Sequence, residues 1–287
     1  TKTVNKLGLN WKDMLPTVYI LIPEKAEYQE TMLNFITPYV LAKQSHMDVK
    51  LWPEWNPIPK DASAALIAGF ALSDKGKNHV RNFLENGGKV LQSFYHDFGD
   101  FKSDGNPYSL ENPKITVVKR EGLTELGQPL KARGDVKFQK VLPVENAEII
   151  MNTKDNQGNE HGVLYKTMIG KGSYYYLAAN WEKALKNIYN PWLEDDANII
   201  YSVLRPDYEF QVDNKFVEFY HKQNKETNLL IFINHSDEFQ HVQLSSHKIY
   251  EFTDILTGEE LANDRNLPLF MEPGGAAFIS FSNDNDK

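Results

Sequence analysis

Residues 64–94 contain the pattern that most limits how this chain can fold. The stretch begins with an apolar run over 64–70 that has no polar alternation, so we expect a strand covered on both faces. Ser73 can cap a helix after it, Gly87-Gly88 can end that helix, and a second apolar run covers 89–94. Three apolar residues of the helix fall on one stripe: Val80, Phe83 and Leu84. A strand, a helix and a strand in close succession predict a right-handed βαβ unit with parallel strands.

The same alternation begins earlier in the chain. Residues 17–22 and 47–52 are predicted to be strands, with a helix between them that starts near Lys25 and that Pro38 should kink or divide. A loop with three prolines follows over 53–59. This order of elements predicts a doubly wound sheet with helices on both faces.

Regular patterning weakens after Asp97. Residues 98–114 are rich in glycine and proline and predict an excursion, and 120–137 are too polar to assign. Gly170-Lys171-Gly172 predicts a tight hairpin turn. The further expected elements are strands over 115–118, 148–151, 162–168 and 174–179 and a helical segment over 197–204.

Residues 207–282 have a different character from the rest. Short runs rich in β-branched and aromatic residues alternate with turn residues, which predicts a small all-β sandwich. The predicted organisation is a lead-in over 1–15, an α/β domain over 16–206 that ends at Pro206, the sandwich over 207–282, and a polar tail over 283–287.

Charge and cysteine content exclude several kinds of function. The 287 residues carry a formal net charge of −8 and no basic stripe, so we expect no nucleic-acid partner. The absence of cysteine excludes disulfides, thiolate metal sites and a cysteine nucleophile. No run is long enough to span a membrane. We expect no cofactor. The lack of cysteine favours a cytoplasmic location, and secretion stays open.

Several segments resemble one known family. AALIAGFALSD, FLENGGKVLQSF and IGKGSYYYLAANWE resemble the domain that follows the catalytic barrel in the family-42 β-galactosidases. NLLIFINHSDEFQHVQL, YEFTDILTGEEL and LFMEPGGAAFISF resemble the small sandwich that ends those enzymes. The resemblance covers residues 17–94 and 140–281, whereas 98–140 match nothing in the family.

The resemblance implies a fold and a role. The first domain, often called the trimerisation domain, has the flavodoxin-like fold of class I glutamine amidotransferases, with a mostly parallel sheet. The catalytic carboxylates of those galactosidases lie on a barrel for which this chain has no room, and the amidotransferase cysteine is absent. The resemblance therefore implies a non-catalytic accessory or oligomerisation region of a glycoside hydrolase of carbohydrate metabolism. Its partners would be a catalytic barrel domain or further copies of the chain.

Two groups of residues are candidates for a ligand or interface site. Tyr95, His96 and Asp97 follow the end of a predicted parallel strand, where open sheets bind ligands, although Asp97 could equally cap a turn. Trp52 and Trp55 flank the proline-rich loop and could bind a partner, stack on a sugar or pack on their own domain. Two alternatives to the accessory role stay open: a carbohydrate-binding protein with exposed aromatic residues, and a free-standing hydrolase with a site near Tyr95, His96 and Asp97.

No metal site and no catalytic residue is predicted. Three consecutive acids at 194–196 seldom face one ion, so a solvated helix start is the simpler interpretation. Four histidines lie on separate predicted strands or turns without the close pairing of zinc ligands: His221, His235, His241 and His247.

Overall fold

The computed structural model describes residues 11–24, 28–118, 130–131, 135–142, 144–184, 196–205, 207–225 and 227–282. The chain divides into two compact units. The mixed-sheet unit comprises residues 17–45 and 49–205, and the all-β unit comprises residues 1–16, 46–48 and 206–287. The mixed-sheet unit is therefore inserted into the sequence of the all-β unit. Pro206 and the tail over 283–287 lie outside the described residues.

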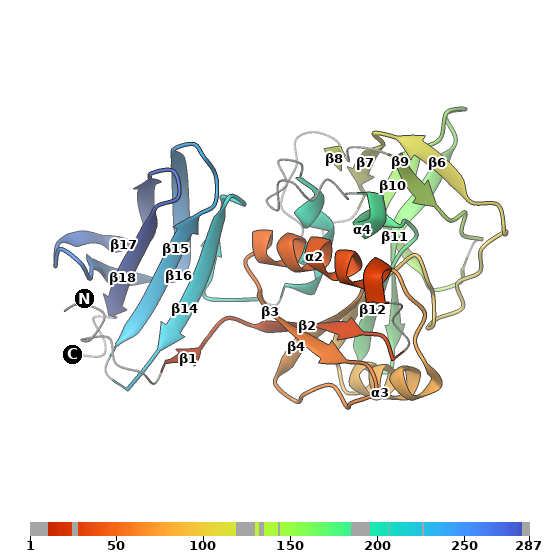
Figure 1. Ribbon diagram of the computed structural model, residues 1–287, viewed down its shortest axis with the longest axis horizontal. Coiled ribbons are helices and arrows are strands. Elements are labelled where there is room, and N and C mark those ends of the chain that lie inside the picture. The colour runs from red at the N-terminus through yellow and green to blue at the C-terminus, as the bar shows by residue number, and fades with distance from the viewer. Residues whose placement is uncertain are drawn as a thin grey trace. The chain divides into compact units, whose positions relative to one another are not determined.

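The mixed-sheet unit is built on a nine-stranded sheet in the order β3-β2-β4-β5-β12-β11-β10-β7-β8 (Figure 1). Its strands are β2 (Thr17–Ile22), β3 (Asp48–Pro53), β4 (Ala62–Ile67), β5 (Lys89–Ser93), β7 (Lys114–Val117), β8 (Leu130–Lys131), β10 (Glu148–Lys154), β11 (Glu160–Ile169) and β12 (Gly172–Leu177). A separate pair contains β6 (Tyr108–Glu111) and β9 (Asp135–Phe138). The helices are α2 (Tyr28–Gln44), α3 (Asp74–Glu85), α4 (Trp181–Ala184) and the 3-10 helix η1 (Asp196–Leu204).

The expectation of a mostly parallel, flavodoxin-like sheet of the class I glutamine amidotransferase type is wrong. Pairing is parallel between β2 and β4, between β4 and β5, and between β5 and β12. It is antiparallel from β12 through β11, β10 and β7 to β8. The tight turns after β10 and β11 return the chain at once to the neighbouring position, and such a turn can join only antiparallel strands. The protein as a whole is rich in antiparallel strands.

Helix α3 packs on β5 and β12 and covers one face of the sheet, and α2 packs on β2 on the other side (Figure 1). The N-cap of α3 is Ser73, whose hydroxyl accepts a hydrogen bond from the N–H of Gly76 at 3.1 Å. Val80 and Leu84 are fully buried, whereas Phe83 is only half-buried and lies beside that stripe. Of the three apolar residues predicted to form the buried stripe, Val80 and Leu84 are in the core and Phe83 is at its edge.

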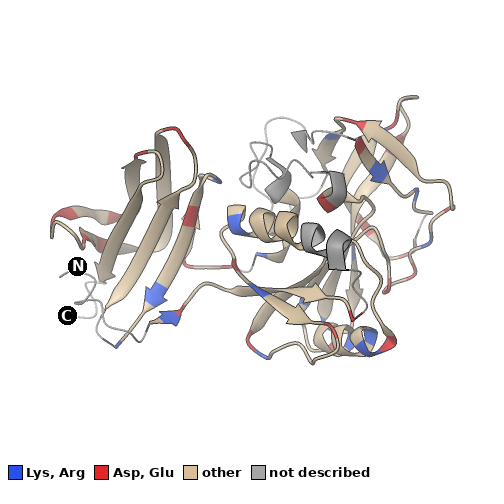
Figure 2. Cartoon of the chain, viewed as in Figure 1, with Lys and Arg blue, Asp and Glu red and all other residues tan. Residues whose placement is uncertain are grey.

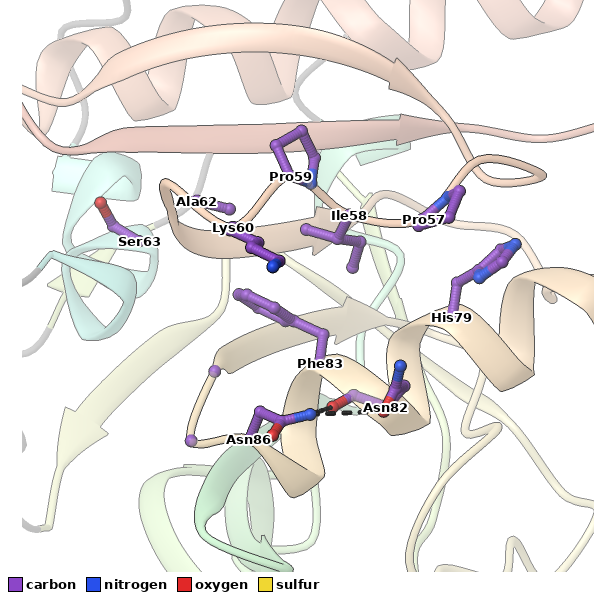
Figure 3. Close-up of a pocket in the computed structure, with 12 residues that line it drawn as sticks. Pro57, Ile58, Pro59, Lys60, Ala62, Ser63, His79, Asn82, Phe83 and Asn86 are labelled. Carbon is purple, nitrogen blue, oxygen red and sulfur yellow. Dashed lines mark hydrogen bonds between the residues drawn. The ribbon is translucent and has the colours of Figure 1, made fainter.

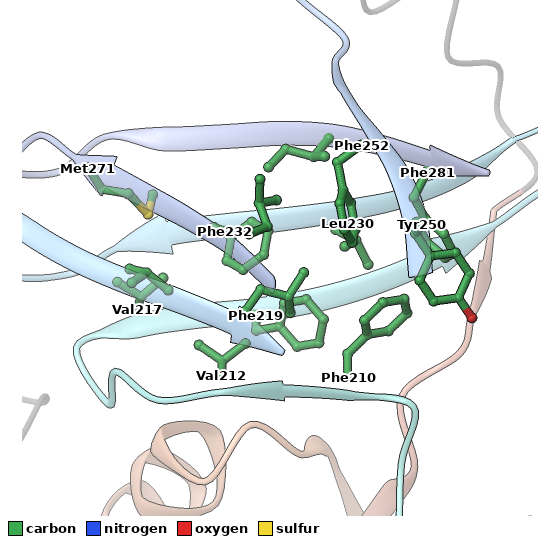
Figure 4. Packing of buried hydrophobic residues seen from close by; sticks show 14 of the residues in the cluster. Phe210, Val212, Val217, Phe219, Leu230, Phe232, Tyr250, Phe252, Met271 and Phe281 are labelled. Atoms are coloured by element: carbon green, nitrogen blue, oxygen red, sulfur yellow. The ribbon is translucent and has the colours of Figure 1, made fainter. Parts of the chain in front are cut away.

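The all-β unit is a seven-stranded antiparallel sheet. Its strands are β1 (Lys12–Asp13), β13 (Phe210–Val212), β14 (Val217–Gln223), β15 (Asn228–Asn234), β16 (Gln240–Asp254), β17 (Glu260–Met271) and β18 (Ala276–Ser282). The first half of β16 pairs with β13 and its second half pairs with β18, across an irregularity between Ser245 and Tyr250. Alternate residues of these strands face one aromatic-rich core (Figure 4).

The start of the described chain belongs to the all-β unit. Strand β1 pairs with β14, and Leu15 lies in the core of this unit with 6% of its surface exposed. The region that the sequence suggests as a lead-in therefore contributes, from residue 11 onward, a strand and a core side chain.

Candidate functional site

The carboxyl ends of β4 and β5 meet the N-terminus of α3, at the kind of position where open sheets bind ligands. Two carboxylates of the chain itself fill this position. Glu54 Oε2 accepts the N–H of Ser73 at 3.0 Å, and Asp97 Oδ2 accepts the N–H of Leu72 at 2.8 Å. The N–H groups at a helix N-terminus attract negative charge. The two carboxylates thus occupy the N–H groups of Leu72 and Ser73, which immediately precede the first turn of α3.

Glu54 is almost completely buried, with 2% of its surface exposed. Its second oxygen, Oε1, accepts the N–H of Glu24 at 2.8 Å, so one side chain ties the end of β2 to the start of α3. A Cβ atom at Gly76 would lie 2.2 Å from Glu54 Oε2. The glycine in the first turn of α3 therefore makes room for this carboxylate.

Substitution of Glu54 by glutamine is expected to destabilise the protein by about 2 kcal/mol, because an NH₂ group would then face a backbone N–H that needs an acceptor. Urea unfolding followed by circular dichroism measures this loss. The same change at Glu111, whose side chain is exposed, is the control and should alter the unfolding free energy by less than about 0.5 kcal/mol. Equal effects of the two substitutions would contradict the role given to Glu54.

Asp97 belongs to a second hydrogen-bond network. Gln92 Nε2 donates to Asp97 Oδ2 at 2.7 Å, and the N–H of Asp97 donates to Gln92 Oε1 at 3.1 Å. Lys77 Nζ lies 3.2 Å from Asp97 Oδ1. The Tyr174 hydroxyl donates to Gln92 Oε1 at 2.6 Å, and burial raises the pKa of Tyr174 well above its usual value, which keeps that donor protonated. The carboxylate of Asp97 thus holds the loop after β5 to α3.

The other two candidates in this loop have different surroundings. Phe94 has a φ of 63°, which turns the chain sharply after β5. Tyr95 is exposed, and the ring of His96 lies 5.5 Å from that of Tyr176 in an edge-to-face arrangement. The structure therefore joins Asp97 to Gln92 and α3, and it places His96 against an aromatic ring instead of pairing it with Asp97.

The two tryptophans of the proline-rich loop differ in their contacts. Trp52 Nε1 donates to the carbonyl of Pro57 at 3.1 Å, and its ring lies 5.6 Å from that of Tyr19. Trp52 therefore fixes the path of the loop while packing against the core. Trp55 is half-buried.

A buried carboxyl group that sequence reasoning did not single out lies at the end of β5. Ser93 Oγ donates to Glu182 Oε1 at 2.5 Å, and the hydroxyl of Tyr201 donates to the same oxygen. Burial raises the pKa of Glu182. Glu182 Oε2 has no hydrogen-bond partner among the described residues. All three side chains are buried, so the cluster joins α4 and η1 to β5.

A cavity of about 250 Å³ lies beside Tyr108 and His161. The carboxylate of Asp155 accepts the N–H groups of Gln157 and Asn159 at 2.9 Å each, and it pairs with His161 Nε2 at 2.9 Å. The hydrogen bond from His161, followed by those from Asn159 and Gln157, lowers the pKa of Asp155. Asp155 thus stabilises the turn between β10 and β11.

A larger groove, of about 700 Å³, separates α3 from the loop that leads into β4. In Figure 3, Phe83 points from α3 toward Ile58 and Lys60 of that loop. The groove is lined by Pro57, Ile58, Pro59, Lys60, Ala62, Ser63, His79, Asn82, Phe83, Asn86, Gly87 and Gly88. None of these residues is acidic.

No metal centre is found in the described part of the chain. No group of three histidine, aspartate or glutamate side chains is placed to hold an ion there. His221 is buried, His235 lies 2.8 Å from Glu218, and His241 is 4.9 Å from the ring of Phe270. Both acidic and basic residues occur on each unit, and acidic residues outnumber basic ones in the all-β unit (Figure 2). Glu194 and Asp195 are outside the described residues, and so is the side chain of Asp196.

Comparison with known proteins gives no sequence relative but several proteins of similar fold. Neither a protein-family model nor a curated protein matches the sequence. A β-galactosidase from Bacillus circulans sp. alkalophilus matches with a TM-score of 0.66 and 13% identity, over 98% of this chain and 44% of that one. A catalytic mutant of a GH42 β-galactosidase from G. stearothermophilus matches with a TM-score of 0.62 and 11% identity, over 93% of this chain and 40% of that one. An α-L-fucosidase from Paenibacillus thiaminolyticus matches with a TM-score of 0.68 and 11% identity, over 99% of this chain and 51% of that one.

The chain shares the fold of part of several glycoside hydrolases. Identities of 11–13% show the fold alone, so the expected relation to glycoside hydrolases is confirmed at the level of the fold. The chain spans about two fifths to half of the length of the enzymes it matches.

In the described residues, no helix is long and apolar enough to cross a membrane.

Proposed function

We propose that this chain is a non-catalytic accessory region of a glycoside hydrolase, which associates with a catalytic barrel domain or with further copies of itself. The observation that carries the proposal is the position just before α3, where Glu54 and Asp97 already accept the N–H groups of Ser73 and Leu72. The fold likeness to glycoside hydrolases covers nearly all of this chain and about half or less of each enzyme, which is consistent with an accessory part.

The chemistry of glycoside hydrolysis supports the same proposal. The reaction generally needs two carboxyl groups that face one bound sugar. The groove beside α3 has no acidic residue in its lining, and the cavity beside Tyr108 has only Asp155. That carboxylate already accepts four hydrogen bonds. Neither cavity therefore offers a pair of free carboxyl groups.

Exposed aromatic side chains on the all-β unit support association. Phe270 of β17 has 83% of its surface exposed, and Phe239, just before β16, has 74%. The two lie near the same end of the hairpin, because Gln240 pairs with Met271 and His241 pairs with Phe270. Aromatic side chains of this kind are enriched at protein interfaces.

Light scattering coupled to size-exclusion chromatography tests the association. We expect an oligomer, or a complex with a separately expressed barrel domain of a family-42 β-galactosidase, and no hydrolysis of a panel of chromogenic glycosides. The double substitution Phe239→Ser and Phe270→Ser is expected to weaken association at least about tenfold. Ile249→Ser, at a residue with 53% exposure elsewhere on β16, is the matched control. The proposal would be contradicted by a chain that stays monomeric and does not bind the barrel domain. Glycosidase activity of the chain alone would contradict it as well.

A further inference from the structure

We propose that the groove between α3 and the loop over 57–63 is a binding site for a pyranose sugar, as part of an oligosaccharide. Its volume of about 700 Å³ lies within the range of small-molecule sites, about 300–1,000 Å³. It differs in position from the candidate residues Trp52, Trp55 and His96, none of which lines it.

One wall of the groove is a single face of α3. His79, Asn82, Phe83 and Asn86 are spaced so that they follow one another along the helix surface. This face runs beside the buried stripe that anchors α3 to the sheet. The side chains in the groove therefore stand on a rigid element, which favours a site with fixed geometry.

The opposite wall is also held in place. Pro57 and Pro59 have restricted backbone torsions. The carbonyl of Pro57 accepts a hydrogen bond from Trp52 Nε1 at 3.1 Å, and that of Pro59 accepts one from the N–H of Ala62 at 3.1 Å. A groove formed before the ligand arrives lowers the entropic cost of binding.

The aromatic ring in the groove is positioned by a glycine. A Cβ atom at Gly88 would lie 2.4 Å from the ring of Phe83, so the ring rests on the bare backbone there. Phe83 is half-buried and extends toward Ile58 and Lys60 (Figure 3). An aromatic face with polar groups around it suits the apolar C–H face of a pyranose ring.

The amides beside this ring present a donor and an acceptor. Asn86 Nδ2 donates to the carbonyl of Asn82 at 2.8 Å and to Asn82 Oδ1 at 3.3 Å (Figure 3). These bonds orient both side chains and leave Asn82 Nδ2 and Asn86 Oδ1 for a ligand. Sugar hydroxyl groups both donate and accept, so one sugar can satisfy both amides.

His79 adds an unsatisfied polar atom at the end of the groove near Pro57 (Figure 3). Its Nε2 is buried and has no hydrogen-bond partner among the described residues. This atom has almost no accessible surface, so the polar contacts to a sugar in the groove come from Asn82 and Asn86. Lys60 is the charged residue of the lining, which excludes a cationic ligand and suits a neutral sugar or a uronate.

Calorimetric titration of the full chain with neutral galacto-oligosaccharides and with oligogalacturonates tests the site. We expect saturable binding that the double substitution Asn82→Ala and Asn86→Ala weakens at least about tenfold. Asn78→Ala, at an exposed residue of the same helix outside the groove, is the matched control and should leave binding unchanged. Lys60→Met is expected to weaken uronate binding alone if a uronate is preferred, and to leave neutral-sugar binding unchanged.

Absence of saturable binding of either sugar class at about 10 mM overturns the proposal, as does binding that the double substitution leaves unchanged. Unrelated peptides are not expected to displace bound sugar. Saturable binding of a peptide in the groove in place of sugar would also overturn the proposal. The oligomeric state of the Asn82→Ala and Asn86→Ala variant is expected to equal that of the wild type. A failure of the sugar site can thus be told apart from a failure of the association proposed above.

Discussion

Replacement of Gly172 by alanine is expected to destabilise the mixed-sheet unit by about 3–4 kcal/mol. A Cβ atom at this position would lie 2.4 Å from the carbonyl oxygens of Gly88 and Leu84 and 2.9 Å from Leu84 Cα. These are backbone atoms at the end of α3 and the start of β5, so no side-chain rotation can relieve the contact. The turn between β11 and β12 packs directly against the end of α3, and the substitution would separate them.

Gly158→Ala is the matched control for this prediction. Gly158 also lies in a tight turn, with a φ of 85°, but a Cβ atom there would meet nothing within 4 Å. Only the conformational cost of the left-handed region applies, about 1 kcal/mol. Urea unfolding of the two variants compares the costs. A Gly172→Ala variant no less stable than Gly158→Ala would show that the turn and α3 do not need this close approach.

The same turn shows what the sequence can and cannot predict about the fold. Gly170-Lys171-Gly172 correctly predicts a hairpin, because turn chemistry is local. The order in which strands join a sheet depends on contacts between distant residues, and the pattern of strands and helices alone suggested a mostly parallel sheet. The βαβ unit over 64–94 is present, with β4 and β5 parallel. It is followed by antiparallel strands that give the sheet its mixed character.

The candidate site was less accessible to sequence reasoning than the fold. The capping role of Ser73 follows from the residue type alone. The carboxylate that reaches α3 from Glu54 comes from a loop 19 residues earlier, and Glu182 meets Ser93 across 89 positions. No local spacing marks either contact. The groove beside α3 was missed because Phe83 falls on the helical stripe that predicts a buried core residue, yet in the structure it is half-buried.

Acid is expected to destabilise the all-β unit through His221, by about 3 kcal/mol at pH 4. His221 is buried between Phe210 and Phe281, with ring separations of 5.5 Å and 5.3 Å, and Nδ1 bonds to the hydroxyl of Tyr208. Burial lowers the pKa of His221 from 6.5 to about 4. Between these two values the unfolded chain binds a proton that the folded chain does not. The free energy of unfolding therefore falls as the pH drops through this window and is constant above it.

Urea unfolding of the all-β unit at pH 7.5, 6, 5 and 4.5 measures this effect, and the variant His221→Gln isolates it. Glutamine does not titrate, so the variant is expected to be less stable than the wild type at pH 7.5 and to lose about 2 kcal/mol less between pH 7.5 and 5. The control is His247→Gln, because His247 is half-exposed and lies 3.9 Å from an exposed carboxylate oxygen of Asp207. It should leave the pH dependence within about 0.5 kcal/mol of the wild type. If His221→Gln and His247→Gln show the same pH profile, the acid sensitivity of the unit arises elsewhere, and His221 is accommodated in its protonated form.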